Sequence, residues 1–225
     1  MISTRVFARY GSLWAGLTPT LEHIVRWMNE NSQVVGSPVR ATGGEPANNS
    51  LIAESAFAII ASGRAPGEKV SNEDVEAVRN YLAKFGMNPP SDAVLDSDEL
   101  QEVTDLVASM RTMFAQLGTA EIWPAVPGCG VVDSAYADIL VAETLYEVKT
   151  VTRAFRGSDL RQLLTYCAMF EASGRTLNSV GLLNPRRGRI VTASLDFVCQ
   201  GASGLTRPEL MREIVRRMAE MQVSG

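Results

Sequence analysis

The sequence predicts an α/β protein in which a helical N-terminal region precedes a mixed sheet flanked by helices. Apolar residues recur at helical spacing as far as Leu117, and after Gly118 the pattern changes to short runs rich in Val, Ile and Tyr, which are typical of strands. With 225 residues, of which 46% are hydrophobic, the chain can also bury a substantial core.

Four helices are expected before the strands begin, and their predicted ranges are 18–28, 51–61, 71–85 and 97–117. Each begins at a residue typical of helix starts, namely Thr18, Ser50, Ser71 or Ser97. Gly86 ends the third helix, and the segment 87–96 with its two prolines is predicted to be a linker. We therefore divide the chain into a helical N-terminal region, 1–96, and a second domain, 97–225.

The second domain is predicted to contain strands at 122–126, 130–141, 144–151, 177–183 and 189–195. A helix over 158–173, with Ser158 at its start, separates the third strand from the fourth. A helix that begins at Pro208 ends the chain. The expected order from residue 97 is therefore helix, three strands, helix, two strands, helix.

Several classes of protein are disfavoured by composition. No apolar run reaches the roughly 20 residues that span a bilayer, and the N-terminus lacks the apolar stretch of a secretion signal, so we expect a cytoplasmic protein without membrane contact. Three widely spaced cysteines favour neither a disulfide framework nor a zinc site. The single histidine, His23, lies among apolar residues and is expected to be partly buried, which disfavours a Ser-His-Asp mechanism.

The charge is unevenly distributed along the chain. The net charge is −4, yet residues 147–189 hold eight basic and three acidic residues, whereas residues 1–146 hold nine basic and 18 acidic ones. The basic residues of this region that we expect along a phosphate backbone are Lys149, Arg153, Arg156, Arg161, Arg175, Arg186, Arg187 and Arg189. The alternative is a solvated basic face that balances an acidic neighbour.

Acidic and basic side chains gather on two adjoining predicted strands. Asp138 falls in one, and Glu147 and Lys149 fall two residues apart in the next. Because side chains alternate across a strand, Glu147 and Lys149 face the same way, while Tyr146 and Val148 face the core. An acid pair with a nearby lysine suits metal-assisted cleavage of a phosphodiester; the alternative is a salt bridge on a solvated sheet face.

These residues and the order of elements around them resemble the PD-(D/E)xK nuclease superfamily. Its restriction-endonuclease-like αβββαβ core carries an acid on the second strand and an acid-x-Lys on the third, which Asp138 and Glu147-Val148-Lys149 match. Ala137 precedes Asp138 where the family usually has proline, and Asp133 is a rival for the acid position.

A second motif lies in the helix that follows. Gln162 and Tyr166 are similar to the Gln-x-x-x-Tyr motif of the RecB-like and Cas4-like branch, and they share one helix face because they are four residues apart. The alternative for this pair is helix capping and core packing. The resemblance covers about residues 97–195; the first hundred residues match no family that we can name.

The resemblance implies a Mg²⁺- or Mn²⁺-dependent nuclease, with DNA as the expected substrate and restriction, phage defence or repair as the expected setting. Asp138, Glu147 and the Val148 carbonyl would be the metal ligands, since hard oxygen atoms suit these ions. Lys149 would orient or activate the attacking water, and Gln162 and Tyr166 would hold Lys149 or a phosphate.

The family usually adds a carboxylate from a helix that precedes the sheet. The candidates in this chain are Glu99, Glu102, Asp105, Glu121 and Glu54, and their spacing does not choose among them.

Two other functions remain open at this point: a non-cleaving DNA-binding subunit of a larger nuclease complex, and an interaction domain. In the second case the apolar helix 51–61 and the Met-rich helix 97–117 would form the interface. We also expect the N-terminal helices to mediate homo-oligomerisation or partner docking, because their apolar surface exceeds what one small sheet can cover.

Overall fold

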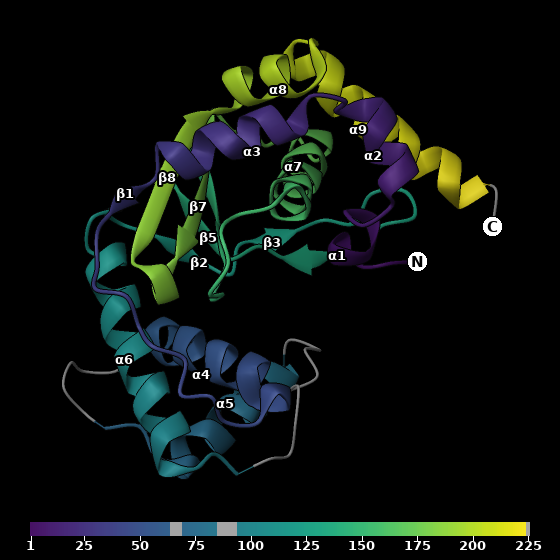
Figure 1. The fold of residues 1–225 in the computed structure, drawn as a ribbon. Helices are drawn as coiled ribbons and strands as arrows, with labels where there is room; N and C mark the ends of the chain where they lie inside the picture. The colour runs from purple at the N-terminus through teal and green to yellow at the C-terminus, as the bar shows by residue number, and fades with distance from the viewer. Residues whose placement is uncertain (64–68, 85–93, 224–225) are drawn as a thin grey trace.

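The computed structural model describes residues 1–63, 69–84 and 94–223. Its centre is a mixed sheet of six strands in the order β1-β8-β7-β6-β5-β2, with helices on both faces, which confirms the predicted α/β class (Figure 1). The strands are β1 (Gln33–Val34), β2 (Glu121–Ile122), β5 (Ile139–Val141), β6 (Thr144–Val148), β7 (Ser179–Asn184) and β8 (Arg189–Ser194). The β6 and β7 strands are parallel, and the other neighbouring pairs are antiparallel.

One face of the sheet packs against α7 (Gly157–Ala172), which connects β6 to β7. Around α7 lie α1 (Thr4–Phe7), α2 (Gly11–Leu17), α3 (Leu21–Glu30), α8 (Leu195–Ser203) and α9 (Arg207–Val223), as Figure 1 shows. Their apolar side chains form a first hydrophobic core with Leu140, Leu145 and Leu182 of the sheet.

The other face meets a group of three helices, α4 (Asn49–Ala61), α5 (Asn72–Lys84) and α6 (Ser97–Phe114), in the lower part of Figure 1. They form a second hydrophobic core with Ile139, Tyr146 and Leu183. The apolar residues that suggested an oligomer interface lie inside this core, since Leu51, Met110 and Met113 are fully buried. Their burial within the chain removes the observation behind that expectation.

Alternation along β6 places its side chains on both faces, as predicted. Leu145 points into the first core and Tyr146 into the second. Glu147 follows on the side of α7 and is only 3% exposed, so the face that carries it is covered and not solvated. The same alternation brings Lys149, just beyond the end of β6, to the side of Glu147.

The first two predicted strands are wrong in extent. The range 122–126 is divided into β2 and β3 (Ala125–Val126), because Trp123 adopts a positive φ of 53° and Pro124 has no amide hydrogen. The range 130–141 is divided likewise into β4 (Ala135–Tyr136), which pairs with β3 in a separate sheet, and β5. Asp138 therefore lies just before β5 and not within a strand.

The sequence patterns do not predict several of the smaller elements. The α1, α2 and β1 elements are too short for a clear period, and α8 begins directly after β8, where only a strand end is expected. Asp96, not Ser97, caps α6 through a capping box with Glu99. Likewise α7 begins at Gly157, one residue before the predicted Ser158.

The division at residue 96 stays a prediction, although contacts cross it. The β1 strand pairs with β8, and α4 packs against α6. Phe85, Gly86 and most of the expected linker 87–96 lie outside the described residues. In the described ranges we find no helix with the length and apolar character needed to cross a membrane.

Candidate active site

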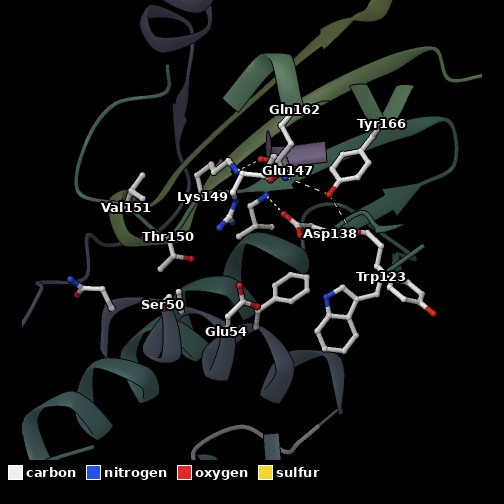
Figure 2. Close-up of a pocket in the computed structure, with 16 residues that line it drawn as sticks. Ser50, Glu54, Trp123, Asp138, Glu147, Lys149, Thr150, Val151, Gln162 and Tyr166 are labelled. Atoms are coloured by element: carbon white, nitrogen blue, oxygen red, sulfur yellow. Dashed lines mark hydrogen bonds and ion pairs between the residues drawn. The ribbon is translucent and has the colours of Figure 1, made fainter. Parts of the chain in front are cut away.

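A pocket of about 450 Å³ lies between α4 and the sheet, and contains the acid pair and the lysine predicted from the sequence (Figure 2). Its walls come from segments that are far apart in the chain: α1, α4, the turn at Trp123, β4 and the residue before β5, β6 with the segment that follows it, and α7. All five predicted catalytic residues line it: Asp138, Glu147, Lys149, Gln162 and Tyr166. Val148 lines it as well.

Asp138 and Glu147 are brought together by the register of the β5–β6 pair. The two strands are antiparallel and Ile139 is opposite Tyr146, so Asp138, just before Ile139, lies beside Glu147, just after Tyr146. The amide of Val148 donates a hydrogen bond of 2.7 Å to Oδ2 of Asp138. Burial, and then the charge of Glu147, raise the pKa of Asp138 well above its ordinary value, although Lys149 and the Val148 amide act in the opposite direction.

Lys149 is held by two side chains. Its Nζ donates to Oε1 of Glu147 at 2.6 Å and to Oε1 of Gln162 at 3.0 Å. Burial disfavours the charged ammonium, but Glu147 and Asp138 outweigh it and raise the pKa of Lys149. The pocket therefore keeps a cation in a fixed position beside its acid pair.

The Gln162 and Tyr166 side chains extend this network from one face of α7. Gln162 Nε2 donates to the Tyr166 hydroxyl at 3.4 Å, and that hydroxyl donates to the carbonyl of Tyr136 at 3.3 Å. Thr4 of α1 also donates to the Tyr166 hydroxyl, at 3.2 Å. Burial, followed by the charges of Glu147 and Asp138, raises the pKa of Tyr166, which keeps the hydroxyl neutral and able to donate.

The structure chooses among the five candidates for the upstream acid. Only Glu54 lines the described pocket, and Figure 2 shows it extending from α4 toward the side of the pocket that carries Asp138. Burial raises the pKa of Glu54, and Glu147 adds to this, while Arg5 and Lys149 oppose it. The sequence signal for Glu54 was an acid within a strongly apolar helix, but only the tertiary structure shows what it faces.

The other four acids have partners elsewhere. Glu99 belongs to the α6 capping box, and Glu102 pairs with Arg186. Asp105 accepts from Gln101 on the exposed side of α6, and Glu121 pairs with Arg175.

Asp133, the rival of Asp138, is absent from the pocket lining that the structure describes. Its amide donates instead to the carbonyl of Ile2, which ties its loop to the N-terminal segment.

The six arginines expected to bind nucleic acid are absent from the described lining of the pocket: Arg153, Arg156, Arg161, Arg186, Arg187 and Arg189. Arg186 is 4% exposed and paired with Glu102, so its burial does not fit the expected contact with a phosphate backbone. Arg153 is bound by both carboxylate oxygens of Asp159. Arg156 is exposed.

Sequence reasoning missed several residues of the pocket wall, and four of them have large side chains. Arg5 reaches it from α1, and Phe57, Trp123 and Tyr136 supply aromatic surface. Trp123 has a positive φ, a strained backbone conformation that is enriched at functional sites. No pattern in the sequence predicts this conformation.

The donor set fits a hard divalent ion of the Mg²⁺ type. Asp138 and Glu147 present adjacent carboxylates, and the pKa of Asp138 is raised by burial and then by the charge of Glu147, a repulsion that a cation would offset. In the described part of the chain, no three His, Cys, Asp or Glu side chains are close enough to hold a metal ion together. Mg²⁺ binds through one or two protein carboxylates and keeps several waters, and Asp138 and Glu147 offer two carboxylates.

Comparisons of the chain with protein-family models, with curated proteins and with solved structures give no match. Any functional assignment therefore depends on the residues and geometry of this pocket.

Proposed function

We propose that the chain is a Mg²⁺- or Mn²⁺-dependent nuclease that hydrolyses phosphodiester bonds in DNA. The observation that carries the proposal is the meeting of Asp138, Glu147 and Lys149 in one pocket. When the separate β3–β4 sheet is set aside, the chain order of α6, the antiparallel strands β2, β5 and β6, α7 and β7 parallel to β6 agrees with the αβββαβ core of the PD-(D/E)xK nucleases. That agreement supports the resemblance seen in the sequence.

Asp138, Glu147 and the carbonyl of Val148 would hold the metal ion, and Glu54 faces the same space. When bound, the ion would lower the pKa of a water molecule and offset charge on the phosphate. The carboxylates are suited to this because the Val148 amide fixes Asp138, and burial of Glu147 prevents it from turning outward.

Lys149 would supply a positive charge next to the reacting phosphate, where developing negative charge is stabilised. Gln162 positions the ammonium group by accepting its hydrogen bond, and Tyr166 in turn fixes the amide of Gln162. Lys149 is therefore the group that touches the reacting atoms, and Gln162 and Tyr166 are positioning residues.

The test is a cleavage assay on plasmid and single-stranded DNA with Mg²⁺, Mn²⁺ or EDTA. We expect metal-dependent cleavage that Asp138→Ala or Lys149→Ala reduces by about 100-fold or more, because each removes charge stabilisation from the transition state. Asp133→Ala is the matched control, since this acid is close in sequence but absent from the described pocket lining. Equal activity of the wild type, Asp138→Ala and Lys149→Ala would overturn the mechanism.

The same assay separates the non-cleaving alternative. A wild-type protein that binds DNA but leaves it intact with either metal would be a DNA-binding subunit and not a nuclease.

A further inference from the structure

The pocket has two cationic side chains among its described lining residues, and they differ in whether other side chains bind them. Lys149 is engaged by Glu147 and Gln162. Arg5 is exposed, and it makes no hydrogen bond or close ion pair with any described residue. An arginine on a pocket wall with its donors available is suited to bind an incoming anion, and its planar fork matches the oxygens of a phosphate.

The main chain around Arg5 is held in place. The amide of Ile2 donates to the carbonyl of Val131 at 2.9 Å, and the Ile2 carbonyl accepts from Asp133 at 2.9 Å. On the other side of Arg5, Phe7 is fully buried in the first core. Thr4 donates to the hydroxyl of Tyr166, the residue that fixes Gln162. The segment 2–7 thus places Arg5 at the pocket through the same network that positions Lys149.

We infer that Arg5 binds a phosphate of the nucleic-acid strand beside the one that is cleaved, so that the segment 2–7 is part of the substrate site. This inference rests on the proposed nuclease function and names a contact that the family motifs do not contain.

The charge of the pocket favours such a group. Asp138, Glu147 and Glu54 all line it, and three carboxylates repel a polyanion unless cations offset them. Lys149 is already paired with Glu147. The charge of Arg5 opposes the rise in the pKa of Glu54, which places the guanidinium within electrostatic reach of that acid.

An exposed aromatic side chain in the pocket indicates that the phosphate belongs to a nucleotide. Tyr136 lines the pocket and is 37% exposed, whereas Trp123 and Phe57, whose rings are 5.4 Å apart, line it but are only 9% and 5% exposed. Cationic groups interspersed with aromatic faces are the combination that binds single strands, where bases stack and phosphates pair.

The experiment measures binding without cleavage. A fluorescein-labelled single-stranded DNA of about 12 nucleotides is titrated with protein in EDTA, and anisotropy is read at several salt concentrations. We expect Arg5→Ala to weaken binding about tenfold and to reduce the slope of log K against log salt by about 0.7, the value for one phosphate contact on a single strand. Arg5→Lys keeps the charge and should keep the slope.

Arg9→Ala is the matched control. Arg9 is an exposed arginine four residues further along that is absent from the described lining of the pocket, so its removal should leave the affinity and the slope near wild type. Arg5→Gln repeats the test with a side chain of similar length, and thermal midpoints verify that each variant folds.

The outcomes distinguish the two proposals. A loss of affinity and slope in Arg5→Ala, but not in Arg9→Ala, supports the contact, even if the wild type then fails to cleave with Mg²⁺ or Mn²⁺, in which case only the nuclease function falls. Unchanged affinity and slope in folded Arg5→Ala and Arg5→Gln overturn the contact, whether or not the protein cleaves. A wild type that does not bind the oligonucleotide also overturns it.

Discussion

The ammonium group of Lys149 lies 2.6 Å from Oε1 of Glu147, and the two side chains are only 12% and 4% exposed. Removal of the lysine leaves a carboxylate without its partner in a place that water scarcely reaches. We therefore expect Lys149→Met to lower the free energy of unfolding by about 3 kcal/mol, as for other buried pairs that lose one member. Urea denaturation measures this change.

Arg175→Met is the control for this prediction. Arg175 pairs with Glu121 at 3.1 Å, but both side chains are about half exposed, so the loss should be below about 1 kcal/mol. Equal losses in the two variants would contradict a structural role for the Lys149–Glu147 pair.

The raised pKa of Asp138 predicts a pH dependence of stability. Burial and Glu147 raise this pKa above its unfolded value, so the stabilisation is complete below the unfolded pKa and is lost as the pH rises through the folded pKa. In EDTA the melting temperature should therefore fall as the pH increases upward from about 4, the ordinary pKa of an aspartate. Under the proposed function, Mg²⁺ should oppose the fall, because it would bind the ionised carboxyl.

Asp138→Asn isolates this contribution, since the amide does not titrate. Its melting temperature in EDTA should fall less steeply with pH than that of the wild type, although some fall remains because the pKa of Glu54 is raised as well. Asp133→Asn should behave as the wild type. An Asp138→Asn protein with the wild-type pH profile would show that Asp138 does not carry this effect.

The Tyr166 hydroxyl connects α1 to the site, and its removal should loosen both. Tyr166→Phe deletes one hydroxyl that accepts from Thr4 and Gln162 and donates to the carbonyl of Tyr136. We expect a loss of about 1–3 kcal/mol and faster proteolysis after Arg5 or Arg9, because buried groups are left without partners. Limited trypsin digestion followed by mass spectrometry measures the second effect.

Thr4→Val separates the two consequences. It removes only the α1 contact and keeps the Tyr166–Gln162 hydrogen bond, so proteolysis should increase, and the proposed DNA cleavage should keep its rate at saturating substrate. A Thr4→Val protein as resistant to trypsin as the wild type would argue that this hydrogen bond does not hold α1.

Glu102 and Arg186 form a buried pair that connects α6 to the turn between β7 and β8. We expect Glu102→Leu or Arg186→Met alone to cost about 3–5 kcal/mol, and the double variant to recover most of it, since well-packed apolar residues can replace a buried pair. A double-mutant cycle in urea gives the coupling energy. Additive losses would contradict the pairing.

The parts of the site that the sequence predicts are those set by local rules. The alternation of β6 and the four-residue spacing in α7 place Glu147, Lys149, Gln162 and Tyr166 without knowledge of the rest of the chain. Glu54 and Arg5 could not be assigned, because they meet the acid pair only through packing of α4 and α1, which no local period records. The break at Trp123 was hidden for a similar reason: its backbone conformation is imposed by the surrounding structure.

The same distinction between local sequence pattern and tertiary packing applies to the fold. The long α6 and α7 helices and the β7 and β8 strands have strong periods and are predicted within a few residues, whereas two-residue strands such as β1 exist only because a neighbour pairs with them. The six arginines expected to bind nucleic acid show that counting charges along the sequence does not identify which side chains are exposed. Clustering in sequence does not distinguish Arg156, which is exposed, from Arg186, which is internal.

The pocket draws on both hydrophobic cores, since Glu54 and Phe57 come from the helix group of the second core while Tyr166 comes from the first. A partial unfolding that frees α4 from the sheet would separate Glu54 and Phe57 from the other residues of the pocket. The amides of β6, β7 and α7 would still be protected from hydrogen exchange. The free energy of that partial unfolding, and not that of global unfolding, then sets the temperature at which the protein ceases to function.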